Sequence, residues 1–417
     1  MPNSLIGFFH QRIWRRLPVG VRRAIFARIS EWRAPSITLG AKTREPIIIV
    51  GMLRQASGLG DAARKSHDAL KTAGLRVYGI DVTGALMHEA NHAGFRFEDG
   101  RGLLGEGTVI LHVSGPVVPR VMASLGRRFV RGKRIMAHWF WELPTLPENW
   151  RSALPFLHDI CASTRFVADA IRPMAGGRPV HVVSYPIEPE AIQPIRHLHA
   201  GPFTAFVAFN FASNFARKNP CAAIRAFRRA FGDDPGARLI IKYLNEASWP
   251  DGVRLMQEAA EGAQNIVMNG EVLDDAGVGG LYQQADVVMS LHRAEGLGLT
   301  IAEAMLRGLP VIATNWSGNT DFFTAEAGFP VGFTLIPIDD PQNNYDGAGI
   351  RWKDPADAVW ADADIDEAAA ALRMLRADAE LREGLGVAGA KIAHDFFEPA
   401  RHVEQITRIL HGDGPRP

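Results

Sequence analysis

The sequence contains few cysteines and no long apolar run. Only two cysteines, Cys161 and Cys221, occur among its 417 residues, which excludes a disulfide framework and fits a reducing compartment. The longest apolar runs, such as Ile47–Val50 with its neighbours, are far too short to span a bilayer. We find no secretory segment and no internal repeat beyond two halves rich in strand–helix units. With 47% hydrophobic and 22% charged residues, the composition is typical of a soluble globular protein, and the length predicts two to three domains.

Acidic residues are nearly missing from the first forty positions. Residues 1–40 contain seven arginines against a single acid, Glu31, a local charge of +6 in a chain whose formal net charge is +1. Pro18 and Gly20 divide residues 1–35 into two short amphipathic helices. They predict either an interfacial helix on an anionic membrane or an extension packed on its own domain. Nucleic acid is a poorer interpretation, since no known binding fold accompanies the arginines. Five aromatic residues are interleaved with the arginines: Phe8, Phe9, Trp14, Phe26 and Trp32.

The clearest pattern runs from residue 286 to residue 321. Two strand-like runs, Val287–Leu291 and Pro310–Thr314, flank a glycine-bearing loop and a short helical pattern. This strand–loop–helix–strand order predicts a unit of a parallel sheet. The loop places Glu295 just past the carboxyl end of a strand, where open α/β sheets bind ligands. Backbone N–H groups of residues 298–300 would then form an anion site at a helix N-terminus.

Two carboxylates, Glu295 and Glu303, lie eight positions apart in this unit. Ionised carboxylates only accept hydrogen bonds, so both suit hydroxyl-rich groups such as a ribose and a hexose. For Glu303 a second interpretation is open. Thr300 and Glu303 match the capping box, which needs no ligand.

The stretch EGLGLTIAEAMLRGLPVIAT, residues 295–314, resembles the Glu-x7-Glu signature of the retaining nucleotide-sugar glycosyltransferases called group 1. The following NWSGNTDFF resembles a variant found in bacterial polysaccharide and lipid-glycan members. The resemblance covers residues 46–410. It implies an α/β fold of the GT-B type, in which two Rossmann-like, doubly wound domains face each other across a cleft. It also implies that a hexose passes, with retention, from a nucleoside diphosphate sugar to the hydroxyl of a glycan or lipid-linked acceptor.

On this resemblance, His138 at the end of strand Arg134–Ala137 contacts the donor sugar, and Glu295 holds it; we assign both as catalytic. A histidine is more often structural, and adjacent cations are more often surface charges, but their positions at strand ends favour the site. Relatives often carry an arginine where this chain reads Phe209-Asn210-Phe211, so we expect Lys242 to contribute instead. The predicted donor-binding residues are Gly58, Gly60, Arg217, Lys218, Lys242, Glu271, Val272, Gly296, Leu297, Gly298, Leu299, Thr300 and Glu303. The predicted acceptor residues are His112, Trp139, Trp141 and Glu142.

The predicted donor-binding residues have different roles. Gly58 and Gly60 let the backbone approach the ligand, although this loop lacks the third glycine of a dinucleotide fingerprint and the lysine of a P-loop. Arg217, Lys218 and helix N-termini neutralise the diphosphate, because no Cys/His cluster or Asp-x-Asp pair marks a metal site. We expect neither a metal nor a cofactor. The turn at residues 269–272 holds the base.

We expect five segments: a basic extension (1–45), an acceptor domain (46–192), a linker (193–201), a donor domain (202–389) and a terminal helix that crosses back (390–417). Three alternatives stay open: a GT-B epimerase or phosphorylase, a non-catalytic nucleotide-sugar-binding protein, and a membrane scaffold. Guanine with mannose and uracil with glucose-type sugars both fit the donor, and family grounds favour mannose. The expected location is the cytoplasm, or the inner face of a bacterial cytoplasmic membrane through residues 1–35.

Overall fold

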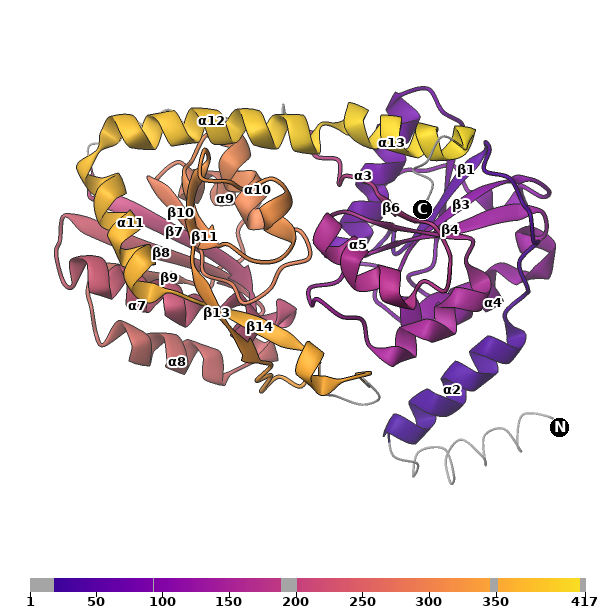
Figure 1. Ribbon diagram of the computed structural model, residues 1–417, viewed down its shortest axis with the longest axis horizontal. Helices are drawn as coiled ribbons and strands as arrows, with labels where there is room; N and C mark the ends of the chain where they lie inside the picture. Colours follow the sequence, from indigo (N-terminus) through magenta and orange to yellow (C-terminus); the bar gives the residue numbers. More distant parts are fainter. Residues whose placement is uncertain (1–18, 93, 189–200, 346–351, 413–417) are drawn as a thin grey trace.

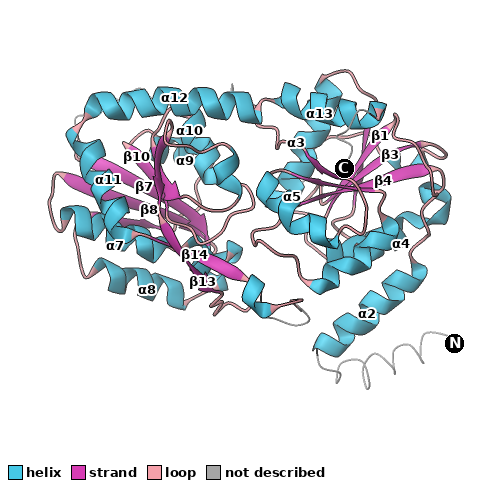
Figure 2. Ribbon diagram, in the orientation of Figure 1, coloured by secondary structure: helices cyan, strands magenta, loops and turns pink. Residues whose placement is uncertain are grey.

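The computed structural model describes residues 19–92, 94–188, 201–345 and 352–412. Residues 1–18 of the basic extension and most of the expected linker lie outside this range. Two six-stranded sheets, each covered by helices, stand side by side (Figures 1 and 2). The predicted class, two doubly wound α/β domains, is confirmed. In the described part of the chain, no helix is both long enough and apolar enough to cross a bilayer.

The first domain is built on an all-parallel sheet in the order β2-β1-β3-β4-β5-β6. Both faces of this sheet are covered, so β1 is a continuous apolar run whose residues 47–50 are all 0% exposed. The strands are β1 (Ile47–Gly51), β2 (Val77–Asp81), β3 (Gly107–His112), β4 (Lys133–Trp139), β5 (Asp159–Ala162) and β6 (Val180–Val182). The helices are α2 (Val19–Arg33), α3 (Gly58–Thr72), α4 (Val118–Val130) and α5 (Arg165–Ile171).

The second domain repeats this plan with the parallel order β12-β11-β10-β7-β8-β9. Its strands are β7 (Phe203–Asn210), β8 (Ala237–Leu244), β9 (Ile266–Asn269), β10 (Val287–Ser290), β11 (Val311–Thr314) and β12 (Gly328–Val331). Its helices are α6 (Phe215–Lys218), α7 (Pro220–Phe231), α8 (Asp251–Ala260), α9 (Asp275–Tyr282), α10 (Leu299–Leu306) and α11 (Ile365–Ala377). An antiparallel hairpin that the sequence analysis did not predict, β13 (Phe333–Pro337) with β14 (Val359–Ala363), follows β12 and precedes α11.

Two long helices connect the domains (Figure 1). Helix α12 (Ala379–Phe397) packs on α10 of the second domain, and α13 (Pro399–His411) packs on α3 of the first. In α13, His402 lies 2.9 Å from Ser66 Oγ and 2.7 Å from the Ser184 carbonyl oxygen. Because Pro399 lacks an N–H, it ends one helix and starts the next.

Helix α12 runs without interruption from Ala379 to Phe397, and Gly386 lets it pack closely on the end of α10. A Cβ at Gly386 would lie 2.0 Å from the Gly308 carbonyl oxygen. Helix α3 begins at Gly58, where Ser57 Oγ accepts the Gly60 N–H at 3.2 Å. One predicted boundary was wrong: strand β4 continues to Trp139, two residues beyond the predicted end at Ala137.

Candidate active site

The two domains face each other across a cavity of about 560 Å³. Its walls are loops at the carboxyl edges of both sheets, mainly those after β1, β2, β3 and β4 and those after β7 and β10. These loops include both points where the strand order switches, between β1 and β3 and between β7 and β10, where open α/β sheets bind ligands. The predicted site residues that line the cavity are Gly58, Trp141, Glu142, Arg217, Lys218, Glu295, Gly296, Leu297, Gly298, Leu299 and Thr300.

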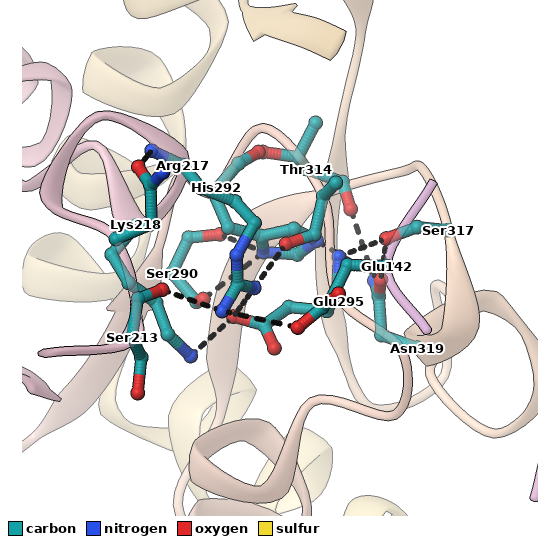
Figure 3. Close-up of polar contacts among 12 residues, drawn as sticks. Glu142, Ser213, Arg217, Lys218, Ser290, His292, Glu295, Thr314, Ser317 and Asn319 are labelled. Carbon is teal, nitrogen blue, oxygen red and sulfur yellow. Dashed lines mark hydrogen bonds and ion pairs between the residues drawn. The ribbon is translucent and has the colours of Figure 1, made fainter. Parts of the chain in front are cut away.

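A charged cluster forms part of the second-domain wall (Figure 3). Lys218 Nζ lies 2.5 Å from Glu295 Oε1, and Arg217 Nη1 lies 3.3 Å from the same oxygen. Arg217 Nη2 is 3.7 Å from Glu142 Oε1, so the cluster reaches the first domain. Arg217 also donates to two backbone carbonyl groups, each at 2.7 Å, and is only 4% exposed. Lys218 is therefore the more accessible of the two predicted diphosphate ligands.

The two cations set the protonation state of Glu295. Burial by itself would raise the pKa of Glu295, but the charges of Lys218 and Arg217 lower it to about 2. Burial opposes the charged form of Arg217, whereas Tyr345, Glu295 and Glu142 favour it and raise its pKa. Glu295 is thus an ionised hydrogen-bond acceptor and a weak base.

Two residues of the segment NWSGNTDFF hold the Glu295 loop in place. The Glu295 N–H donates to Ser317 Oγ at 2.8 Å, and the Gly318 N–H donates to the Glu295 carbonyl oxygen at 2.8 Å. This segment resembles a family variant, and its sequence alone indicated no role for it. The structure shows that it fixes the backbone on which Glu295 stands.

His292 is a second support that the sequence analysis missed. This side chain is 0% exposed, and burial lowers its pKa. Its Nε2 lies 3.1 Å from Asn319 Oδ1 and its Nδ1 lies 3.1 Å from Ser290 Oγ. Its Nδ1 also lies 2.9 Å from the Ser290 carbonyl oxygen, and its Nε2 lies 3.2 Å from the Trp316 carbonyl oxygen. Each ring nitrogen therefore faces a backbone oxygen, and the protonated one donates to it. The Thr314 hydroxyl donates to the His292 carbonyl oxygen at 2.7 Å (Figure 3), which ties β11 to the loop after β10.

The two domains touch through backbone at Gly296. A Cβ at Gly296 would lie 2.5 Å from the Trp141 carbonyl oxygen, and a Cβ at Gly318 would lie 2.1 Å from the Gly296 carbonyl oxygen. Thr164 Oγ1 donates to that Gly296 oxygen at 2.9 Å. Only glycine permits these approaches, and they bring Trp141 and Glu142 beside Glu295.

The Trp141 ring joins aromatic residues of both domains. Its centroid is 5.2 Å from that of Trp150 in its own domain and 5.9 Å from that of Tyr345 in the other. Its Nε1 donates to the Thr145 carbonyl oxygen at 2.7 Å. Trp141 is therefore both a lining residue and part of the contact between the domains.

Glu303 lies one turn further along α10 and faces a second cavity of about 460 Å³. Helices α3 and α10 line both cavities with successive turns, so the two cavities follow the same pair of helices.

The capping-box interpretation of Glu303 is wrong. The residue preceding α10 is Gly298, at φ +92°, a left-handed conformation that favours glycine, and no side chain caps the helix. Glu303 Oε2 instead accepts from the Tyr282 hydroxyl at 3.2 Å. Burial raises the pKa of Glu303, although Arg307 and Lys65 oppose that rise.

Three predicted residues lie in the core and not on the cavity wall. His138, in β4, is 2% exposed, stacks on Phe140 at 4.9 Å and bonds Ser163 Oγ through Nε2 at 2.9 Å. His112 and Trp139 are each 1% exposed. The extra length of β4 explains the difference, because it keeps His138 and Trp139 inside the sheet while Phe140 and Trp141 reach the cleft.

Besides Glu303, four predicted donor-binding residues do not line the cavity of about 560 Å³. Lys242 is 5% exposed, and its Nζ donates to the Tyr243 carbonyl oxygen at 2.7 Å. Glu271 and Val272 are exposed in the turn between β9 and α9, with Val272 89% exposed. Gly60 contacts its own loop, where a Cβ would lie 2.4 Å from the Gln55 carbonyl oxygen. Their roles in binding stay predictions.

One histidine of the cavity wall was missed. His88, after β2, is exposed and lines the cavity together with Ser114, after β3. The sequence around His88 contains no motif that predicts a binding loop, so only the tertiary structure places His88 at the cavity wall. Over the described ranges, no group of three or more histidine, cysteine, aspartate or glutamate side chains is arranged to hold a metal ion.

Comparisons with known proteins agree with this geometry. Residues 209–347 match the family model for glycosyl transferases group 1, and no curated protein matches the chain. Anabaena HepE in complex with UDP and glucose is 14% identical, with TM-score 0.59, over 88% of this chain and 99% of HepE. Sucrose-phosphate synthase from Thermosynechococcus elongatus is 14% identical, with TM-score 0.61, over 88% and 99%.

A third structure, TarM from Staphylococcus aureus, is 10% identical with TM-score 0.53, and the match covers 73% of this chain. This chain spans 55% of TarM's length. These likenesses establish the architecture, and the family match includes Arg217, Lys218, Glu295 and Glu303. The chain thus has a GT-B fold, and residues 209–347 of its second domain are similar to the glycosyl transferases of group 1.

Proposed function

We propose that the protein is a retaining glycosyltransferase that moves a hexose from a nucleoside diphosphate sugar to a hydroxyl of a glycan or lipid-linked acceptor. The observation that carries this proposal is the Lys218–Glu295 pair, which lies beside the start of α10 in a cavity between the carboxyl edges of two sheets. A cation and a helix N-terminus suit a diphosphate, and an ionised carboxylate suits sugar hydroxyls.

Donor binding exchanges one set of contacts for another. Lys218 turns from Glu295 to the diphosphate, and Glu295 accepts hydrogen bonds from hexose hydroxyls. The backbone N–H groups of Leu299 and Thr300, in the first turn of α10, add a partial positive charge where the leaving diphosphate develops its negative charge. Arg217 holds the loop through its backbone contacts and adds a second positive charge nearby.

The protonation state of Glu295 supports retention. Its carboxylate is paired with Lys218 and Arg217 and has a pKa of about 2. Glu295 is therefore poorly suited to take a proton from an acceptor. We propose that the acceptor attacks on the face from which the diphosphate departs, and that the departing phosphate takes the proton.

A thermal-shift screen over GDP- and UDP-sugars tests donor binding, because a ligand that binds only the folded state raises the unfolding temperature. Mannose and glucose donors are the first to compare, since family grounds favour mannose and the HepE complex contains UDP and glucose. Product analysis with a hydroxyl acceptor then tests transfer. Binding without turnover would indicate a nucleotide-sugar sensor, and turnover without an acceptor would indicate an epimerase. Turnover that needs inorganic phosphate would indicate a phosphorylase.

We also propose that residues 1–35 dock the enzyme on an anionic membrane. In the described part, α2 packs on α4 yet leaves Trp32 85% exposed and Ile29 46% exposed beside Arg28 and Arg33. Attraction to anionic lipid is worth about 1 kcal/mol per basic residue and is screened by salt, whereas apolar insertion is not. Binding to phosphatidylglycerol vesicles should weaken with salt without vanishing. A chain lacking residues 1–35 that sediments equally well would rule this out.

A further inference from the structure

Most polar side chains on the first-domain wall of the cavity already have partners. Ser57 Oγ accepts the Gly60 N–H, and the Ser57 hydroxyl lies 3.4 Å from Gln55 Oε1. The Tyr185 hydroxyl donates to Asp61, and Glu142 faces Arg217. These groups hold the wall together and have limited capacity left for a ligand.

His88 and Ser114 differ from these residues. Both line the cavity, and within the described residues neither side chain has a hydrogen-bond or ion-pair partner. They come from the loops after β2 and β3, whereas the Lys218–Glu295 pair belongs to the wall of the other domain. A group held by His88 and Ser114 would therefore meet a donor bound by Lys218 and Glu295 from the opposite side.

The turn that presents His88 is well anchored. The His88 N–H donates to the Thr83 carbonyl oxygen at 3.1 Å, and the Leu86 N–H donates to the Val82 carbonyl oxygen at 3.0 Å. Leu86 is 8% exposed and packs in the core of the first domain. Between them, Met87 has φ +62°, a conformation that residues other than glycine rarely adopt and that is concentrated at functional sites.

The surface around these two polar groups is apolar. Met52, Leu86, Val113, Val117 and Phe140 line the same cavity. An apolar wall with two hydrogen-bonding groups fits one face of a sugar ring, whose C–H groups pack on the apolar side chains while its hydroxyl groups find polar partners.

We propose that His88 and Ser114 form the acceptor subsite, in which the His88 ring accepts a hydrogen bond from a hydroxyl group of a glycoside. This inference rests on the proposed glycosyl transfer, and it replaces the core residues His112 and Trp139 as acceptor contacts. His88 is a positioning residue here, because it holds the hydroxyl while the departing phosphate takes the proton.

The test measures binding of octyl glucoside and octyl mannoside to the full chain by calorimetry, in the presence of UDP or GDP. His88→Ala should weaken glycoside binding about three- to tenfold, the cost of one hydrogen bond. His88→Asn should restore part of it. Ser114→Ala should act in the same direction, and nucleotide affinity should stay unchanged in every variant. Transfer assays should show the loss in the KM for the glycoside more than in kcat.

His92→Ala is the matched control, because His92 is exposed on the same loop but does not line the cavity. The proposal is overturned if His88→Ala and His92→Ala bind both glycosides equally well, or if wild-type protein binds neither. It is also overturned if His88→Ala and His88→Asn both lose kcat while glycoside binding is kept, since that result would make His88 a general base. Transfer by wild-type protein to any other acceptor would leave the proposed function standing in each case.

Discussion

Lys218 and Glu295 neutralise each other across 2.5 Å, and this pairing sets what a change at either residue should do. Lys218 is the partly exposed member of the charged cluster, whereas Arg217 is fixed by backbone carbonyl groups. On the proposed function, removing Glu295 should therefore free a cation for the donor diphosphate and delete the proposed contact to the hexose.

For this reason Glu295→Gln should bind UDP or GDP at least as tightly as wild type, yet slow transfer by roughly 10²–10³, the cost typical of one lost electrostatic contact in the transition state. Calorimetry gives the affinity, and product formation gives the rate. Lys218→Ala is the matched control and should weaken nucleotide binding. Equal loss of nucleotide affinity in both variants would contradict these separate roles.

Glu303 contacts the Tyr282 hydroxyl and lines the adjacent cavity. If it also accepts hydrogen bonds from ribose hydroxyls, Glu303→Gln should weaken nucleotide and nucleotide sugar alike by about ten- to a hundredfold, the range for bonds to a charged group. Tyr282→Phe removes only the protein contact and should weaken them far less. A change in unfolding temperature with unchanged nucleotide affinity would show that Glu303 serves stability alone.

At the scale of elements, two glycines at the start of α3 have different surroundings, although the sequence alone predicted the same role for both. A Cβ at Gly58 would meet nothing within 4 Å, and Gly58 lines the cavity. A Cβ at Gly60 would lie 2.4 Å and 2.6 Å from two backbone carbonyl oxygens. One glycine leaves room for a ligand, and the other leaves room for the loop itself.

We therefore expect Gly58→Ala to fold with wild-type stability but to bind the donor less tightly, because its methyl group enters the cavity. Gly60→Ala should lose roughly 1–3 kcal/mol of unfolding free energy, as overpacked sites do. Urea unfolding and nucleotide calorimetry on both variants make the comparison. Normal stability of Gly60→Ala would show that the loop can shift to accept a side chain.

At the scale of the molecule, three buried histidines lie under the first-domain wall and its contact with α13. His112 and His138 lie 5.1 Å apart, ring to ring, in neighbouring strands, and His402 comes from the crossing helix α13. Burial lowers the pKa of His112 to about 3 and that of His402 to about 4, and it lowers that of His138 well below its usual value. All three are neutral in the folded protein at neutral pH.

An unfolded chain binds protons at these histidines below about pH 6.5, while the folded protein does not. Stability from this source is therefore complete above about pH 6.5 and falls as the pH drops toward the folded values. Between about pH 7.5 and about pH 5.5, each histidine should lower the free energy of unfolding by up to about 1.4 kcal/mol. Urea unfolding at the two pH values measures the total.

His112→Leu separates this effect from other acid effects. Within the described residues neither ring nitrogen of His112 has a hydrogen-bond partner, so an apolar side chain of similar size should cost little stability at neutral pH. The variant should lose less stability on acidification than wild type. A slope identical to that of wild type would contradict the assignment.

The sequence alone determined the repeating strand–helix order, the two-domain class and the glutamate loop, because each follows from local signals: apolar runs, glycines at strand ends and the spacing of Glu295 and Glu303. Four consecutive apolar residues, Ile47–Val50, were enough to predict strand β1. The glycine loop after it could likewise be predicted, although the residue at which α3 begins could not.

Only the tertiary structure decided which side chains reach the cleft. The two additional residues of β4 keep His138 in the core. The turn after β2, which no sequence motif marks as a binding loop, brings His88 to the cavity wall. The partner of Glu295 is Lys218, 77 positions away in sequence, and the low pKa of Glu295 exists only where two cations converge on it. Burial and charge pairing depend on how the two sheets and the crossing helices pack together, and a local sequence pattern contains no information about that packing.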